Sequence, residues 1–223
     1  MSSVDCDRLI MNGDIIDGWQ LKNSSDKWTV VHSAFFYVIM KMMEKHSTEV
    51  IYVTGNHDDF LDPLVPSKMA NITLVNEFII KEKNHSYVVI HGHAFDSITA
   101  RLTFLAKLGD VAYNLLLKFN NVWNRARLKR GKEYYSLSKV IKHKVKQAVS
   151  AISGFESDLD SFARAKGCDG IICGHIHTPE DKYLKSGVHY LNSGDWVESL
   201  TALTEDYDGN WSVVKFSDFI NRK

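Results

Sequence analysis

Hydrophobic and polar residues follow two spacings in the first part of the chain. Short apolar runs at Arg8–Asn12 and Glu49–Val53 each end in a glycine-containing turn, which predicts two buried strands. Between them, Trp28–His46 carries apolar side chains at helical spacing. A strand, a helix and a second strand in this order predict a parallel pair with a crossover helix, and therefore an α/β fold.

The same two spacings predict further elements toward the C-terminus. Glu77–Lys81 and Tyr87–Ile90 have the pattern of a hairpin around Asn84, Asp158–Lys166 that of a helix, and Asp169–Cys173 that of a buried strand. The remainder alternates apolar and polar residues, so we expect antiparallel strands there. They lie at Tyr183, Val188–Leu191, Ser199–Leu203 and Trp211–Phe216, with a hairpin signal at Asp208-Gly209.

One stretch departs from this pattern. Residues Ile98–Ser150 contain no strand signal and no proline, and their leucines recur at helical spacing. We therefore expect a helical cap at residues 98–150, inserted into a core formed by residues 1–97 and 151–223. Within it, Arg101–Ser150 carries twelve Lys or Arg against two acidic residues, a net charge of +10. This basic run, with Arg125, Arg127 and Arg130, is a candidate contact for an anionic substrate or membrane, or a solvated face.

Composition narrows the class of protein. Of the 223 residues 44% are hydrophobic, which suits a packed domain, and 27 basic residues balance 27 acidic ones. We therefore expect no stable nucleic-acid complex. The cysteines Cys6, Cys168 and Cys173 form no C-x-x-C pair, which is typical of a reducing compartment. Without a signal peptide or a membrane-spanning run, we expect a cytoplasmic protein, with peripheral contact to the inner membrane through the basic cap.

Polar residues that can hold a metal follow four of the predicted strands. The four loops are Gly13-Asp14-Ile15-Ile16-Asp17, Gly55-Asn56-His57-Asp58, His91-Gly92-His93 and Gly174-His175-Ile176-His177. Because ligands of α/β sheets bind beyond the carboxyl ends of the strands, we expect these loops to converge there. Imidazole nitrogens with carboxylate and amide oxygens suit Mn, Fe or Zn rather than calcium. Asp17 is either a functional residue or a helix N-cap, and Asp58 is interpreted as beginning a turn.

The order G-D-x-x-D, G-N-H-D, a strand-ending His and G-H-x-H resembles the calcineurin-like metallophosphoesterase superfamily, over most of the chain outside the cap. The resemblance implies a sandwich of two mixed β-sheets flanked by helices, with a two-metal cleft at the strand ends. The metal ligands that it implies are Asp14, bridging both metals, Asn56, His91 and His175 for one metal, and His177 for the other. It also implies that His57 stabilises the transition state and protonates the leaving oxygen, with Asp17 orienting its other ring nitrogen.

Within the superfamily, the sequence is most similar to the UDP-2,3-diacylglucosamine pyrophosphatase group of lipid A biosynthesis. The similarity rests on the stretch Leu191-Asn192-Ser193-Gly194-Asp195-Trp196-Val197-Glu198 and on the cap between the third and fourth motifs. It implies hydrolysis of a nucleotide-linked lipid sugar with a divalent metal, manganese first among the candidates. His57 and His93 stand where the best-known members have Arg and Asp, which leaves the substrate open. For His93 three roles stay open, namely no function, support of a metal ligand or contact with the substrate, and we take it as a candidate substrate contact.

The superfamily's opening strand, which ends in D-x-H and supplies two ligands of the first metal, has no counterpart in this chain. We expect Met1 to be a late start or a chain boundary. One metal would then bind strongly and the other, held by Asp14 and His177, weakly. An incomplete sheet also favours a homodimer. Two alternatives stay open: a phosphodiesterase or nuclease acting on another nucleotide substrate, and a truncated, weakly active or non-catalytic metal-binding paralogue.

Overall fold

A computed structural model describes residues 5–23, 28–82, 85–95 and 154–220. By its internal contacts the chain divides into two units, one formed by Met1–Ala94 with Asp160–Lys223 and the other by Phe95–Leu159. The predicted cap at residues 98–150 lies outside the described residues, and so do its arginines, so the domain boundaries stay a prediction. Within the described ranges, no helix combines the length and the apolar character that crossing a membrane requires.

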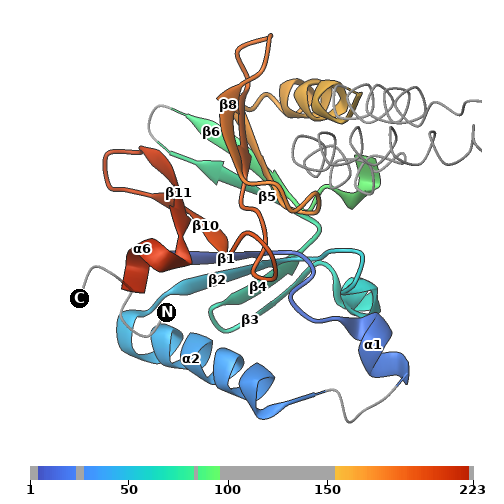
Figure 1. The fold of residues 1–223 in the computed structure, drawn as a ribbon, viewed down its shortest axis with the longest axis vertical. Coiled ribbons are helices and arrows are strands. Elements are labelled where there is room, and N and C mark those ends of the chain that lie inside the picture. Colours follow the sequence, from blue (N-terminus) through green and yellow to red (C-terminus); the bar gives the residue numbers. More distant parts are fainter. Residues whose placement is uncertain (1–4, 24–27, 83–84, 96–153, 221–223) are drawn as a thin grey trace, which may run out of the picture. The chain divides into compact units, whose positions relative to one another are not determined.

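The first sheet of the core has the strand order β1-β2-β4-β3 (Figure 1). Its strands are β1 (Arg8–Asn12), β2 (Glu49–Val53), β3 (Ser67–Met69) and β4 (Ile72–Val75). Strands β1 and β2 are parallel and helix α2 (Val30–His46) lies between them in the chain, as the apolar pattern predicts. Strand β4 extends the sheet in parallel and β3 pairs with it in antiparallel fashion. The pattern does not predict these two strands, because runs this short give little periodicity.

The second sheet has the order β5-β6-β7-β9-β8. Its strands are β5 (Glu77–Lys81), β6 (Ser86–Ile90), β7 (Gly170–Cys173), β8 (Glu180–Tyr183) and β9 (His189–Asn192). Strands β5 and β6 form the predicted antiparallel hairpin. The expectation of antiparallel pairing is right for β9 against β8 and wrong for β9 against β7, which are parallel. All of β9 is buried, as is usual for an inner strand of a parallel array.

The last strands, β10 (Thr201–Glu205) and β11 (Trp211–Lys215), form a separate two-stranded antiparallel sheet. Asp208-Gly209 lies in the turn between them, where Gly209 has a φ of +85°, so the predicted hairpin is confirmed. The remaining helices are α1 (Gly18–Asn23), η2 (Asp59–Leu64), η3 (His93–Phe95) and α6 (Phe216–Ile220). Residues 154–165 are also helical, where the sequence predicts a helix at Asp158–Lys166.

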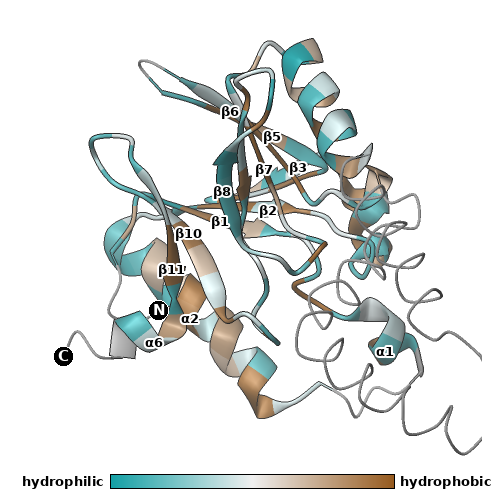
Figure 2. Cartoon of the chain, turned by 45° about the horizontal axis from the view of Figure 1, so that its top comes forward, coloured by the Kyte–Doolittle hydropathy of each residue, from teal (hydrophilic) through white to brown (hydrophobic). Residues whose placement is uncertain are grey.

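Alternate residues of β2 belong to two different buried clusters, one on each face of the first sheet. Ile51 and Val53 belong to a buried cluster that also contains residues of β6, β7 and β9, so this cluster joins the two sheets. Val50 and Tyr52 lie in a second cluster with Ile39 of α2, which covers the outer face of the first sheet (Figure 1). Figure 2 shows that α2 carries hydrophobic and hydrophilic residues side by side, as a helix on such a face requires. The α/β fold with mixed sheets flanked by helices is confirmed.

Candidate metal centre

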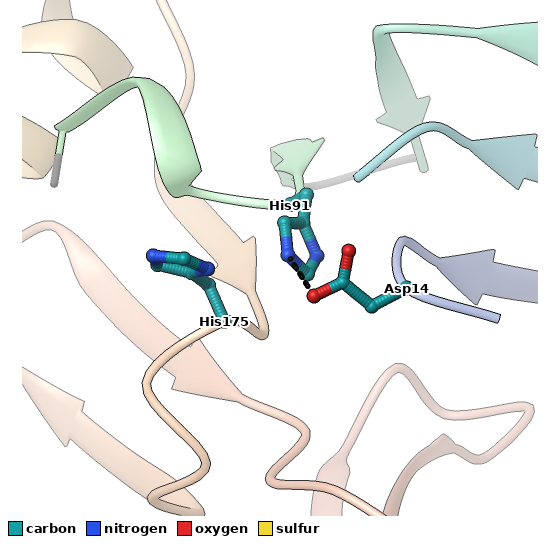
Figure 3. Close-up of side chains that lie close together, drawn as sticks. All are labelled: Asp14, His91 and His175. Carbon is teal, nitrogen blue, oxygen red and sulfur yellow. Dashed lines mark ion pairs between the residues drawn. The ribbon is translucent and has the colours of Figure 1, made fainter. Parts of the chain in front are cut away.

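Three of the predicted ligands meet at the carboxyl ends of three strands. Asp14 follows β1, His91 follows β6 and His175 follows β7. One ligand atom from each lies within 4.8 Å of the other two, and Figure 3 shows the three side chains gathered around one point. Two of these atoms, His91 Nε2 and Asp14 Oδ2, lie 3.1 Å apart. The structure therefore brings these three residues together, as convergence of the loops predicts.

Backbone geometry at Gly13 allows this approach. Gly13 has a φ of +75°, and a Cβ atom there would lie 2.1 Å from His91 Nδ1, so only glycine fits. His91 Nδ1 instead donates a hydrogen bond to the carbonyl oxygen of Asn12, at 2.9 Å. This bond keeps a proton on Nδ1, so that Nε2, which faces Asp14, is the nitrogen that can bind a cation once it carries no proton. Gly55 is equally constrained, because a Cβ there would lie 2.3 Å from Asp14 Oδ1.

Asp14 is held in its ionised form. Although burial raises its pKa, the neighbouring His91 imidazole and the His57 backbone N–H outweigh that effect and lower the pKa below its ordinary value. The His57 N–H donates to Asp14 Oδ1 at 2.8 Å, which leaves Oδ2 on the side of His91. An ionised carboxylate and a neutral imidazole are the forms that coordinate a divalent cation.

Two polar atoms in the loops that contact Asp14 have no hydrogen-bond partner. Among the described residues, Asn56 Oδ1 and His91 Nε2 are buried and have no hydrogen-bond partner. Buried polar atoms are nearly always hydrogen-bonded, so acceptors without a partner in these loops indicate a missing electrophile. A cation that accepts oxygen and nitrogen ligands meets that requirement, and the residues present therefore fit one.

The predicted pair of His57 and Asp17 also forms. His57 Nδ1 lies 3.2 Å from Asp17 Oδ1, and the same oxygen accepts the backbone N–H of Gln20 at 3.0 Å. Asp17 therefore caps α1 and contacts His57 at once, which agrees with the N-cap interpretation, while its functional role stays a prediction. Slight burial raises the pKa of Asp17, but hydrogen bonds from Gln20 and His57 outweigh that effect and lower the pKa below its ordinary value. Trp19 stacks on the His57 ring with centroids 4.2 Å apart, a contact that sequence reasoning missed.

Two predicted residues, His177 and His93, do not belong to the group of three. His177 is half exposed, and its Nδ1 lies 3.0 Å from Asp195 Oδ2. His93 is exposed, and its ring centroid lies 5.6 Å from that of His91 and 6.4 Å from that of His175. A side chain at that distance can reach a molecule bound at the centre, which keeps the predicted substrate contact open.

Asp58 has a role that its position in a turn does not reveal. It precedes η2, as expected, but its side chain is fully buried. Its carboxylate accepts the N–H groups of Ile15, Ile16 and Gly55 and the hydroxyl of Tyr52. Asp58 thus ties the loop after β1 to the loop after β2. No local sequence signal predicts this link, because its partners in the loop after β1, Ile15 and Ile16, lie more than 40 residues away in the chain.

Comparisons with known proteins give one family and several similar solved structures. A family model described as calcineurin-like phosphoesterase matches residues 2–179. Similar solved structures include an archaeal phosphodiesterase (11% identity, covering 93% of this chain and 98% of that one, TM-score 0.38). A Vps29 mutant from Entamoeba histolytica has 15% identity, covers 96% of this chain and 85% of that one, and has a TM-score of 0.40. A predicted phosphoesterase from Streptococcus pneumoniae has 13% identity, covers 93% of this chain and 95% of that one, and has a TM-score of 0.33. A comparison with curated proteins gives no match.

Proposed function

The chain belongs to the calcineurin-like phosphoesterase family, and we propose that it hydrolyses phosphoric esters or anhydrides with the help of a divalent cation. The observation that carries the proposal is the convergence of Asp14, His91 and His175, whose ligand atoms lie within 4.8 Å of one another. A phosphoesterase needs such a centre because a phosphate ester is anionic and repels an anionic nucleophile.

This convergence supports the first of two proposed ligand sets. Asp14, His91 and His175, with the unpartnered Asn56 Oδ1, would hold one cation, and Asp14 and His177 would contribute to a second. Manganese is the first candidate, with iron and zinc as alternatives that the same donor set accepts. When bound, the cations would neutralise phosphoryl oxygens and lower the pKa of an attacking water.

His57 is the proposed proton donor to the leaving oxygen. Its Nδ1 faces Asp17 and Trp19 covers one face of its ring, so that the ring cannot rotate freely. Nε2 is thereby left for the substrate. The N–H of His57 also holds Asp14, which couples the position of the proton donor to that of the carboxylate.

The favoured substrate is a nucleotide-linked lipid sugar of the UDP-2,3-diacylglucosamine type. Its support is the sequence similarity around Asp195 and Trp196, together with His93 at the edge of the centre. The alternative is a phosphodiester of another nucleotide. Hydrolysis of UDP-2,3-diacylglucosamine and of a generic aryl phosphodiester, measured side by side at saturating Mn²⁺, separates the two, because only the first substrate has acyl chains and a diphosphate.

Three variants test the proposed centre. We expect His175→Ala to weaken Mn²⁺ binding by about 100-fold or more, because it removes a direct ligand. His57→Gln keeps Mn²⁺ binding and lowers the hydrolysis rate by about 10²–10⁴-fold, the usual contribution of a proton donor. His46→Gln, at an exposed ion pair with Asp5, serves as the histidine control and changes neither.

Two outcomes would contradict the proposal. Undiminished Mn²⁺ binding by His175→Ala, in titration calorimetry, would show that the cation binds elsewhere. Protein saturated with Mn²⁺ that hydrolyses neither substrate would favour the non-catalytic metal-binding paralogue instead.

A further inference from the structure

One carboxylate oxygen of Asp195, Oδ1, accepts the hydrogen bonds that hold the loop between β9 and β10. Oδ1 accepts the backbone N–H groups of Val197, Glu198 and Ser199 at 3.1, 2.7 and 2.8 Å. The hydroxyl of Ser199 accepts the Asp195 N–H at 2.8 Å in return. These bonds explain the shape of the loop, but they use one oxygen, and an asparagine side chain could supply the same acceptor.

The other oxygen, Oδ2, lies next to His177. It is buried and has no hydrogen bond in good geometry to any residue that the structure describes, yet it lies 3.0 Å from His177 Nδ1. The Asp195 side chain is only 8% exposed, whereas that of His177 is 50% exposed. Burying a carboxylate oxygen without a partner is unfavourable, so its placement next to one imidazole nitrogen needs a reason beyond the loop.

That reason is the tautomer of His177. A neutral imidazole carries its proton on either Nδ1 or Nε2, and the hydrogen bond of one nitrogen decides which nitrogen offers a lone pair. A carboxylate that accepts Nδ1–H leaves Nε2 as the ligand and fixes the ring orientation, as it does behind many metal-bound histidines. His91 is fixed in the same sense by the carbonyl oxygen of Asn12.

We propose that Asp195 is a positioning residue that holds His177 in the Nδ1–H tautomer and so presents Nε2 to a divalent cation. The inference rests on the proposed function and deepens it, because it assigns His177 a partner outside the four loops that carry the metal motifs. The cation that depends on it is the one that Asp14 and His177 would share.

Asp195→Asn is the informative variant. The amide oxygen can keep the bonds of Oδ1 to the loop, while its NH₂ group replaces Oδ2 and donates to Nδ1, which forces the proton of His177 onto Nε2. The matched control is Asp206→Asn. Asp206 Oδ1 also accepts loop N–H groups, those of Asp208 and Asn210 at 3.0 and 2.9 Å, but among the described residues it forms no hydrogen bond or ion pair with a histidine.

The first readout is the NMR chemical shifts of the His177 ring nitrogens in metal-free protein, assigned by comparison with His177→Ala. We expect the proton on Nδ1 in the unmodified protein and in Asp206→Asn, and on Nε2 in Asp195→Asn. A residue that only shaped the loop would not move this proton. The second readout is Mn²⁺ titration, in which Asp195→Asn should weaken the lower-affinity site by about 10–100-fold. In the His177→Ala background Asp195→Asn should have no further effect.

Failure of this inference and failure of the proposed function are distinguishable. An unchanged tautomer and unchanged Mn²⁺ affinity in Asp195→Asn would overturn the inference alone. Absence of any Mn²⁺ binding by the unmodified protein would overturn the proposed function and the inference with it.

Discussion

Replacing Asp58 by asparagine tests whether a buried carboxylate holds the centre together. Asp58 Oδ1 accepts the Ile16 N–H at 2.9 Å and the Tyr52 hydroxyl at 2.8 Å, and Oδ2 accepts the N–H groups of Ile15 and Gly55, both at 3.3 Å. Asparagine has nearly the same shape and leaves no cavity. Its amide oxygen can keep the two short bonds, but its NH₂ group would face the other two N–H donors.

The size of the effect follows from these contacts. Two hydrogen bonds are lost and two backbone donors stay buried without a partner, at about 1–3 kcal/mol for each unsatisfied group. Part of the loss is offset, because burial raises the pKa of Asp58 and the variant removes an unfavourably buried charge. We expect a net decrease of about 2–4 kcal/mol in the free energy of unfolding. Tyr52→Phe, which removes one donor and keeps the carboxylate, should lose about 1 kcal/mol.

The assay is urea unfolding of the metal-free proteins, followed by Mn²⁺ titration of each. Because Asp58 connects the loop of Asp14 to the loop of Asn56, Asp58→Asn should also weaken Mn²⁺ binding, whereas Tyr52→Phe should have little effect on it. If Asp58→Asn unfolds at the same urea concentration as the unmodified protein, the carboxylate does not hold the loops, and the reasoning fails.

Two further predictions concern close backbone approach and ionisation. Gly13→Ala should abolish Mn²⁺ binding by displacing His91. The control is Gly167→Ala, because Gly167 has a similar φ of +67° but no atom within 4 Å of the new carbon, so this variant should lose only stability. Equal Mn²⁺ affinities of the two variants would contradict this prediction. Burial raises the pKa of Tyr87 from 10.0 to about 12, so the free energy of unfolding should fall by up to about 1 kcal/mol per pH unit between pH 10 and 12, where only the unfolded state ionises. Denaturant titrations of Tyr87→Phe should show no such slope from this residue, and a persisting slope would assign it to other groups.

The sequence predicts the framework of the centre because the framework depends on local patterns. Apolar runs place β1, β2, β6 and β7, and a glycine or histidine at the end of each marks the loop that follows. The parallel pairing of β9 with β7 cannot be predicted from local sequence, because the burial of a strand does not indicate which distant strand it pairs with. The contacts of Asp58 and Asp195 escape prediction for the same reason. An aspartate in a turn has a sufficient local explanation, and its second partner is visible only in three dimensions.

Backbone conformation links the motifs to the ligand chemistry. Asp14, His175 and His177 have φ values of +55°, +59° and +51°, in the left-handed region that few residues other than glycine adopt. A chain that leaves the end of a parallel strand must turn sharply, and a left-handed residue achieves this within one position. Aspartate and histidine tolerate that conformation better than most residue types, so the positions that need the turn and those that supply the ligand atoms can coincide. Each such residue still costs on the order of 1 kcal/mol, which the loop contacts of Asp58 and Asp195 must offset. The residues that hold the loops are therefore as necessary to the centre as the ligands.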